Sequence, residues 1–375
     1  MNISGVNELW QQPDKTQYHK SPSKELSTRR IYNNALWHRY GPPTSSFDYL
    51  LKAQMMDYEA TRAQFEAYST RWCAKRAATG MIYWMLNSAW PSLHWNLFDY
   101  YMHPAGSYYG AKMGSRMEHL AYDYVQNAVY LINHALDRQG PRNIEVEMID
   151  LRGSLIQNCS NSNTSMLNST MTNNYIARVP DSTRVLRKHI VYNMKPKTSR
   201  KLFETEEVRD IKDVGLLKLV LKDDDDHVLS RNVYWVSGTT DKLDWENSDW
   251  LYTPVKEYVD FSSLSKLQTA NISVSAKWAD SGRNKISVRL ENLSQIPAVF
   301  IRLELVTPNW EASEGDHKWT DVVPLKWSDN YVTLWPWETL DLKVISRKGF
   351  AELYVLLVSG RNLEGFELPI ETERA

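Results

Sequence analysis

Cysteine is nearly absent from this chain of 375 residues, and the absences narrow the possible classes of protein. Only Cys73 and Cys159 are present, so no disulfide framework holds the fold together. No apolar run approaches the roughly 20 residues that a membrane span needs, so we expect no membrane partner. Residues 1–12 lack the basic and apolar regions of a secretory signal, so no signal peptide is visible.

An excess of charge of one sign is missing as well. The 44 Lys and Arg residues nearly cancel the 45 Asp and Glu residues, which leaves a formal net charge of -1 at pH 7. Affinity for phosphate backbones and acidic lipids depends on clustered positive charge. We therefore expect no nucleic-acid partner, and a substrate that is uncharged or carries few charges.

Sequence motifs for cofactor or metal chemistry are also lacking. There is no Gly-rich phosphate loop, no nucleophile elbow and no dinucleotide fingerprint. The histidines of the first third are scattered without metal-ligand spacing, so we expect neither a metal nor another cofactor: His19, His38, His94 and His103. Glu59, Arg62 and Glu66 have the spacing of ion pairs along one helix, which favours a structural role over catalysis.

Aromatic residues, in contrast, are abundant. The chain has 15 Trp and 21 Tyr residues, more than the cores of a protein of this size need. Most of them are expected to fill β-sandwich cores and interfaces. The remainder could offer flat faces for stacking on sugar rings, which makes carbohydrate a candidate ligand.

Residues 1–113 are rich in helix signals. Apolar residues at three- and four-residue spacing predict one long helix over 48–69, with Asp48 as its cap. The continuous apolar run of residues 80–86 suits a strand that is buried on both faces, as in a parallel sheet. A helix followed by a buried strand is one step of a (β/α)8 TIM barrel, which needs ~250 residues in all. This segment is therefore either the last portion of a barrel, with the rest supplied from elsewhere, or not a barrel.

The rest of the chain reads as strands and turns. In residues 114–253 a hairpin is predicted over 217–235, with the acidic run 223–226 as a solvated turn, and the Asn-, Ser- and Thr-rich tract 157–174 is predicted to be a loop. In residues 254–375 alternating patterns predict a series of strands: 272–278, 286–290, 299–306, 331–335, 340–345 and 353–358. Many short strands without helices predict two antiparallel sandwiches.

The best candidate for a functional site follows the predicted buried strand. The segment IYWMLNSAWPSLHW places Trp84, Asn87, Trp90 and Trp95 close together. In a barrel, the carboxyl end of a strand lies at the face that carries the active site. The ring of Trp84 could then form the floor of a sugar subsite, and Asn87 could bind a hydroxyl or amine. The alternative is that these rings plug the barrel or pack on the first sandwich.

Several stretches of the chain resemble a known family. LWQQPDKTQYHKSPSKELSTRRIYNNALWHRYGPP, TGMIYWMLNSAWPSLHWNLFDYY and PAGSYYGAK are similar to the end of the catalytic barrel in exo-β-D-glucosaminidases of glycoside hydrolase family 2. SRNVYWVS, DWLYTP and DNYVTLWPWETLDLKV resemble the two C-terminal β-sandwich domains of that family. The opening of the second region and Trp337, where the family more often has Gly, depart from the pattern.

The resemblance implies a fold and an activity. The fold is multidomain: 1–113 is the C-terminal portion of a (β/α)8 TIM barrel, and 114–253 and 254–375 are two antiparallel immunoglobulin-like β-sandwiches. The activity is release of glucosamine from the non-reducing end of chitosan or chito-oligosaccharides by a retaining mechanism. Both catalytic glutamates of the family precede the segment that resembles residues 7–19, so no residue of this chain is expected to be catalytic.

The same resemblance implies substrate-binding residues. Trp84 matches the family's aromatic floor of the −1 subsite, with Asn87 beside it, and Tyr18 and His19 match a segment near the pocket. A location outside the cell is also implied, and sequons would then allow glycosylation at Asn2, Asn158, Asn163, Asn168, Asn271 and Asn292.

Three hypotheses for function follow. The first is a hydrolase by descent that is inactive alone, because its acid and nucleophile lie outside these residues. The second is a non-catalytic carbohydrate-binding protein built from the two sandwiches. The third keeps the hydrolase but changes the sugar to a β-mannoside. The sequence does not determine the oligomeric state.

Overall fold

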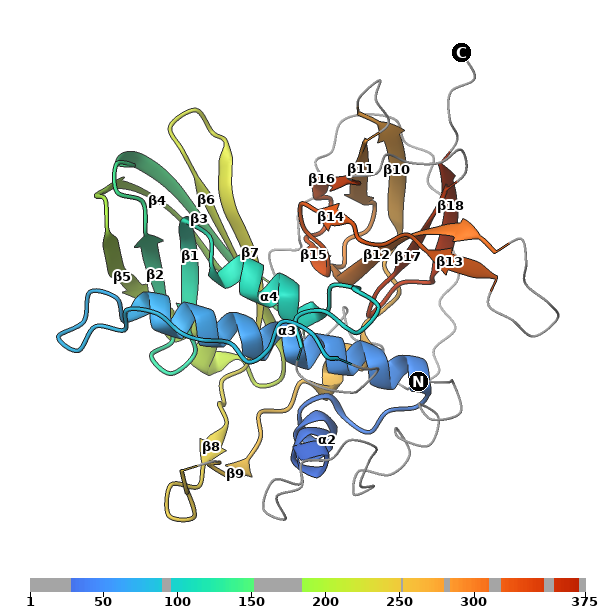
Figure 1. Cartoon of the computed structure of the whole chain (residues 1–375). Coiled ribbons are helices and arrows are strands. Elements are labelled where there is room, and N and C mark those ends of the chain that lie inside the picture. The colour runs from blue at the N-terminus through green and yellow to red at the C-terminus, as the bar shows by residue number, and fades with distance from the viewer. Residues whose placement is uncertain are drawn as a thin grey trace, which may run out of the picture. The chain divides into compact units, whose positions relative to one another are not determined.

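The described part of the chain is mostly β-sheet, with three α-helices (Figure 1). The computed structural model describes residues 28–89, 96–151, 184–250, 252–279, 284–309, 318–346 and 354–370. These residues form two compact units, one up to Leu264 and one from Ser265 onward. The predicted tract 157–174 lies outside the described residues. The domain boundaries at 113/114 and 253/254 stay predictions.

The helices of the first unit are α2 (Thr28–Tyr40), α3 (Ser46–Thr70) and α4 (Gly106–Gly114). The predicted helix over 48–69 is confirmed as α3, but the prediction of its cap is wrong. Ser45 is the N-cap, and its hydroxyl accepts a hydrogen bond of 3.1 Å from the Asp48 N–H. The Asp48 carboxylate accepts one of 3.0 Å from the Thr44 N–H in return. The cap lies three residues earlier because this reciprocal pair satisfies two backbone donors at once.

Two glycines allow α4 to pack closely on α3. A Cβ atom added at Gly106 would lie 2.3 Å from the carbonyl oxygen of Gln54, and one at Gly110 would lie 2.4 Å from that of Tyr58. No side chain fits at either distance, so the two helices meet backbone to backbone. This packing is why a helix rich in glycine is stable here despite glycine's poor helix propensity.

The first unit also contains two antiparallel sheets. One has the strand order β1-β2-β5 and the other β4-β3-β6-β7. Their bounds are β1 (Glu118–Asp123), β2 (Ala128–Asn133), β3 (Gly140–Asp150), β4 (Arg184–Met194), β5 (Thr198–Glu204), β6 (Gly215–Lys222) and β7 (Val228–Val236). A short 3-10 helix, Glu206–Asp210, follows β5, and a two-stranded hairpin comes after β7: β8 (Lys242–Leu243) and β9 (Val255–Glu257).

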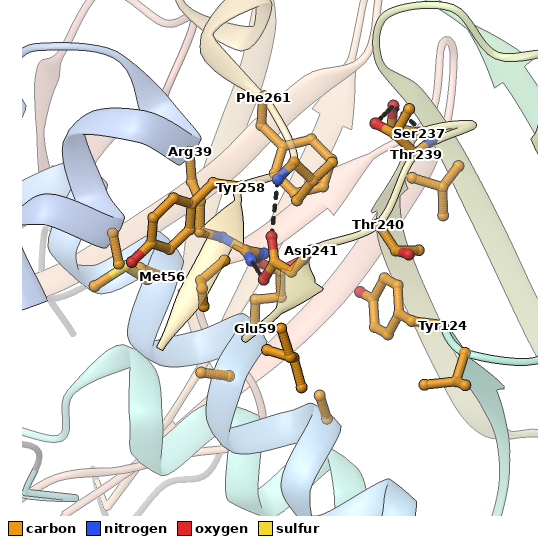
Figure 2. A pocket seen from close by; sticks show the side chains of 18 of the residues that line it. Arg39, Met56, Glu59, Tyr124, Ser237, Thr239, Thr240, Asp241, Tyr258 and Phe261 are labelled. Atoms are coloured by element: carbon orange, nitrogen blue, oxygen red, sulfur yellow. Dashed lines mark hydrogen bonds and ion pairs between the residues drawn. The ribbon is translucent and has the colours of Figure 1, made fainter. Parts of the chain in front are cut away.

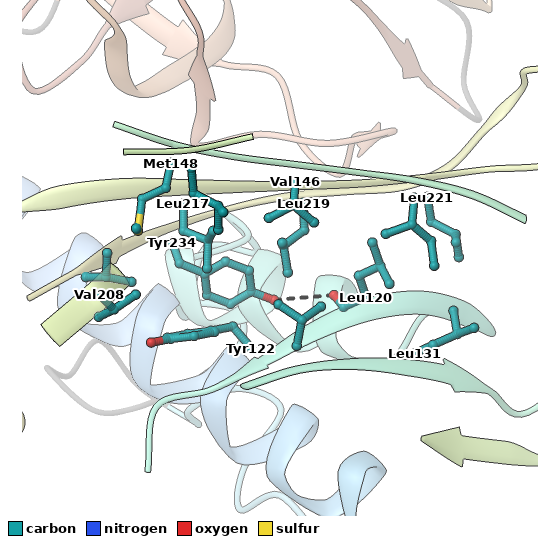
Figure 3. Packing of buried hydrophobic residues seen from close by; sticks show 14 of the residues in the cluster. Leu120, Tyr122, Leu131, Val146, Met148, Val208, Leu217, Leu219, Leu221 and Tyr234 are labelled. Carbon is teal, nitrogen blue, oxygen red and sulfur yellow. Dashed lines mark hydrogen bonds between the residues drawn. The ribbon is translucent and has the colours of Figure 1, made fainter. Parts of the chain in front are cut away.

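The core of this sandwich comes from the inward-facing residues of both sheets. Leu120 and Leu131 of one sheet pack on Val146 and Leu219 of the other, all of them fully buried (Figure 3). The predicted hairpin is confirmed as β6 and β7. The acidic run is a turn, as predicted, because the Asp223 carboxylate accepts the N–H groups of its own loop and the next residues face solvent.

The second unit has two antiparallel sheets, with strand orders β10-β11-β16-β14 and β13-β12-β17-β18, and β15 pairs with β12. A 3-10 helix, Ser262–Lys266, leads into it. The strands are β10 (Ile272–Trp278), β11 (Lys285–Asn292), β12 (Ala298–Pro308), β13 (Trp319–Asp321), β14 (Lys326–Trp327), β15 (Val332–Leu334), β16 (Thr339–Ile345), β17 (Tyr354–Ser359) and β18 (Phe366–Ile370). All six strands predicted here are confirmed: β10, β11 and β16 alternate between a more buried and a more exposed face, whereas β12, β15 and β17 are largely buried.

The predicted buried strand over 80–86 is wrong. These residues form no regular element, and Ile82 and Leu86 are 94% and 58% exposed. A strand needs hydrogen-bonded neighbours on its edges. Every strand pair in the described residues is antiparallel and lies elsewhere, so the apolar run has no parallel sheet to join. The partial barrel therefore stays a prediction.

Two of the predicted glycosylation sites lie in the second unit, and they differ in burial. Asn271 is exposed, whereas Asn292 is fully buried and its side-chain amide donates to the carbonyl oxygens of Ile296 and Trp335 at 2.8 and 3.0 Å. A glycan on that nitrogen would break both bonds. In a host that glycosylates secreted proteins, we expect a glycan at Asn271 and none at Asn292, measured by peptide mass spectrometry. An occupied Asn292 in folded protein would contradict this, and Asn271→Gln serves as the control.

Candidate functional site

The segment of residues 80–89 lies along helix α3 and presents its aromatic residues in two directions. The Tyr83 ring packs 6.2 Å from that of Phe65 on α3, and burial raises the pKa of the Tyr83 hydroxyl. The next residue, Trp84, is 73% exposed. Tyr83 therefore anchors the segment on α3, while most of the Trp84 side chain is exposed to solvent.

A second stretch of chain holds this segment in place. The Leu97 and Phe98 N–H groups donate to the carbonyl oxygens of Met85 and Leu86, at 3.3 and 2.8 Å. The side-chain amide of Asn96, which is buried, donates to the Ser88 hydroxyl. These bonds flank Asn87 on both sides, so its exposed side chain projects from a fixed backbone.

The structure places only some of the predicted binding residues. Trp84 and Asn87 are exposed on one segment, three residues apart. Trp90, Trp95, Tyr18 and His19 lie outside the described residues. The sugar subsite therefore stays a prediction, and Trp84 and Asn87 are its only members among the described residues.

The buried carboxylates of α3 are held in structural networks. Glu59 forms an ion pair of 2.7 Å with Arg39 of α2 and accepts a hydrogen bond of 3.0 Å from the Tyr40 hydroxyl. Glu66 accepts one of 2.8 Å from the Tyr234 hydroxyl. Their hydrogen-bond and ion-pair partners come from other elements, while Arg62 on the same helix acts on Glu66 through its charge.

Glu66 has one property of a general acid. Burial raises its pKa to about 7, the range that suits proton transfer at neutral pH. However, its side chain is only 1% exposed, so no substrate reaches it. We therefore assign Glu66 a structural role, and no described carboxylate is placed as a catalytic acid.

No sequence pattern indicated the cavity that lies in the first unit. This cavity has a volume of about 790 Å³ and lies between α2, α3, the turn after β1 and the β8–β9 hairpin (Figure 2). Arg39 bridges Glu59 and Asp241 at its wall, with distances of 2.7 and 2.5 Å. Arg39 and Asp241 are 202 residues apart in the chain, so spacing alone could not have paired them.

The described residues contain neither a candidate metal site nor a candidate membrane-spanning helix. No group of three or more His, Cys, Asp or Glu residues there could hold a metal ion. No helix there is long and apolar enough to cross a membrane.

Comparison with known proteins gives the family context. Residues 250–363 match the family described as the exo-beta-D-glucosaminidase Ig-fold domain. An exo-beta-D-glucosaminidase of Hypocrea jecorina is 44% identical over 371 residues, which are 97% of this chain and 37% of that protein. The chain is a relative of the exo-beta-D-glucosaminidases. It spans little more than a third of the length of these curated relatives, and matches their C-terminal part.

A solved structure of this family supports the fold. The exo-chitosanase CsxA of Amycolatopsis orientalis superposes with a TM-score of 0.81 at 30% identity, over 99% of this chain and 40% of that one. A mannosylglycoprotein endo-beta-mannosidase of Lilium longiflorum is more distant, 22% identical over 81% of this chain. The relatives are glycoside hydrolases, and the glucosaminidases among those compared are the more similar.

Proposed function

We propose that this chain forms the C-terminal part of a retaining exo-β-D-glucosaminidase that removes glucosamine from the non-reducing end of chitosan and chito-oligosaccharides. The observation that carries the proposal is the 44% identity to a named glucosaminidase across 97% of the chain. The similarity covers the helical region as well as both sandwiches. A protein that kept only the sandwiches for binding would have no need to preserve the helices.

In this proposal α2, α3 and residues 80–86 are the last portion of a (β/α)8 barrel. The exposure of Ile82, Trp84 and Leu86 supports it, because an apolar run of this kind is normally covered. Neighbouring barrel strands from the rest of the protein would pair with the run and bury it. Trp84 would then lie at the rim as the floor of a sugar subsite, with Asn87 beside it.

The chemistry needs residues beyond those described. A retaining mechanism uses two carboxyl groups about 5 Å apart. Glu59 and Glu66 are seven residues apart on one helix, which separates their backbones by roughly 10 Å. Both are held in buried networks. The acid and the nucleophile therefore belong to another part of the protein, and this part supplies the substrate floor and the two sandwiches. We place the whole enzyme outside the cell, where polymeric chitosan is accessible.

The direct test compares the 375-residue chain with a chimera. The chimera joins it to the preceding N-terminal part of the Hypocrea jecorina relative, and both proteins are assayed for glucosamine release from chitosan oligomers. We expect release by the chimera and none by the chain alone. Robust release by the chain alone would refute the missing acid and nucleophile, and a soluble chimera that prefers β-mannosides would favour the mannosidase hypothesis.

Removal of the Trp84 ring tests the substrate floor. In the chimera, Trp84→Ala is expected to lower kcat/KM for chitosan oligomers by roughly tenfold to a hundredfold, because a stacking surface at the reacting sugar is lost. Trp84→Phe should keep most of the activity. Trp250→Ala, an exposed Trp on another element, is the matched control. Equal activity of Trp84→Ala and the control would remove Trp84 from the site.

A further inference from the structure

The cavity of the first unit has walls that are fixed by contacts between distant parts of the chain. Arg39 joins α2 to α3 through Glu59 and to the linker after β7 through Asp241. Asp241 also accepts a hydrogen bond of 2.8 Å from the Val259 N–H. The Phe261 N–H donates to the Arg39 carbonyl oxygen at 2.6 Å. A cavity whose walls are tied in this way loses little freedom when a ligand enters.

The charged residues that line the cavity do not balance. Among the residues that the structure describes, the lining has one cation, Arg39, and three carboxylates, Asp57, Glu59 and Asp241, for a formal charge of −2. Arg39 forms ion pairs with Glu59 and Asp241. A concave surface with surplus charge of one sign attracts ligands of the opposite sign. The cavity therefore favours a cationic ligand.

Aromatic rings and hydroxyl groups form the rest of the lining. Tyr258 stacks on His38 at 5.2 Å, and Tyr124 lies on the opposite side of the cavity from Arg39, with Thr240 beside Tyr124 (Figure 2). Rings with a few polar groups are the usual lining of a small-molecule site, and about 790 Å³ is within the usual range for such sites.

The β8–β9 hairpin adds an exposed tryptophan at the cavity. Trp245 lines the cavity and is 71% exposed. Its position is set by hydrogen bonds within the loop: the Asp244 N–H donates to the Pro254 carbonyl oxygen at 2.8 Å, and the Asn247 amide donates to the Asp244 carboxylate at 2.7 Å. A ring that is held in place and open to solvent is suited to stacking on a sugar or on a cation.

We infer that this cavity binds a glucosamine oligomer, with Trp245 stacked on a sugar ring and the surplus carboxylate charge facing the ammonium groups. The choice of sugar rests on the proposed function, and the cationic, ring-stacking character of the ligand rests on the cavity itself. Trp84 does not line the cavity. The chain therefore holds the polymer at a second place, besides the end that is cleaved.

Isothermal titration calorimetry on the 375-residue chain tests the inference. The probes are three tetramers of equal length, of glucosamine, N-acetylglucosamine and glucose, the last two uncharged. We expect the glucosamine tetramer to bind at least tenfold more tightly than either uncharged tetramer, and its affinity to fall with added salt. Equal affinity for all three would overturn the inference, and so would the absence of binding.

Three variants locate the site. Trp245→Ala should weaken binding of the glucosamine tetramer roughly tenfold. Trp250→Ala removes an even more exposed Trp, 89% exposed, from the same loop and should leave binding unchanged. Trp84→Ala alters the proposed subsite instead of the cavity and should weaken binding less than Trp245→Ala does. Loss of binding in Trp84→Ala with retention in Trp245→Ala would overturn the inference and leave the proposed function intact, since the oligomer would then occupy the proposed subsite.

One further variant tests whether binding in the cavity requires the negative charge of its lining. Asp57→Asn keeps the shape of the side chain but removes one negative charge from the lining. We expect weaker binding of the glucosamine tetramer and unchanged binding of any uncharged tetramer. A parallel loss for all the tetramers would show a change of shape instead of charge, and would count against an ammonium-binding cavity.

Discussion

Replacing Arg62 with methionine is expected to lower the free energy of unfolding of the first unit by about 1–3 kcal/mol, because the buried Val233 carbonyl oxygen loses its hydrogen-bond donor and the contact with the Tyr234 ring is lost. Arg62 is completely buried where α3 meets the first sandwich. Its guanidinium donates a hydrogen bond of 2.8 Å to the Val233 carbonyl oxygen and lies 3.9 Å from the centre of the Tyr234 ring. Methionine fills a similar volume but replaces none of these contacts.

Glu66 adds to this loss, because the Arg62 charge favours its ionised form. Burial raises the pKa of Glu66 to about 7, and the Arg62 guanidinium opposes that rise. Without Arg62 the carboxyl group must take up a proton, and the Val233 carbonyl oxygen loses a donor in a dry interface. Adding Glu66→Gln to Arg62→Met is therefore expected to recover part of the lost stability.

Urea unfolding at pH 7, followed by tryptophan fluorescence and circular dichroism, measures this effect. The matched control is Arg71→Met, which makes the same change at an exposed position just after α3 and should shift stability by less than about 0.5 kcal/mol. Similar unfolding midpoints for the two variants would show that Arg62 does not hold α3 to the sandwich. Additive losses for Arg62 and Glu66 would show that the two are not coupled.

Acidification is expected to destabilise the first unit through His119, by about 2 kcal/mol between pH 6.5 and pH 4.5. His119 is fully buried in β1, and its Nδ1–H donates a hydrogen bond of 2.8 Å to the Arg116 carbonyl oxygen. Burial lowers the pKa of the imidazole to about 3 from its ordinary 6.5. The folded state thus keeps a neutral ring while the unfolded chain takes up a proton, so stability is full above pH 6.5 and is lost as pH falls toward 3.

Glu66 has the opposite dependence on pH. Its folded pKa is raised, so its contribution is greatest below its ordinary pKa near 4.5 and falls as pH rises toward 7. The difference between wild type and His119→Gln, measured by urea unfolding at pH 6.5, 5.5 and 4.5, isolates the histidine. We expect His119→Gln to lack the acid-dependent fall in the free energy of unfolding. His227→Gln, in the exposed turn after β6, should show the same fall as wild type. Parallel pH profiles of wild type and His119→Gln would contradict the assignment.

Local patterns predicted the strands and the long helix well. The alternation in residues 272–290 needed only two faces of different polarity, and it appears as β10 and β11. The periodicity of α3 likewise needed only one continuous helix. In both cases the pattern and its partner lie close in sequence, so short-range information was sufficient.

The apolar run 80–86 shows where a pattern fails. Its composition fits a buried strand, but a strand forms only where neighbours offer backbone hydrogen bonds. In the described residues no parallel neighbour exists, and Ile82 and Trp84 stay exposed. The composition of the segment favours a strand, but whether a strand forms depends on the backbone that packs beside it.

The candidate site was predictable in part. The exposed ring of Trp84 and the nearby Asn87 come from a single segment, so one stretch of sequence could suggest them. The cavity could not be suggested in this way, since Arg39, Glu59 and Asp241 come from two helices and a linker about 200 residues away. Only folding brings their charges together.

The sequence by itself determined the long helix and the antiparallel strands, the low overall charge and the resemblance to the glucosaminidases, because these depend on residues that are neighbours in the chain. The tertiary structure decided the partners of Glu59 and Glu66, the exposure of Trp84, the burial of Asn292 and the existence of a negatively charged cavity. Each of these depends on distances between segments that are remote in sequence, and such distances are set by packing and hydrogen bonding across the whole unit.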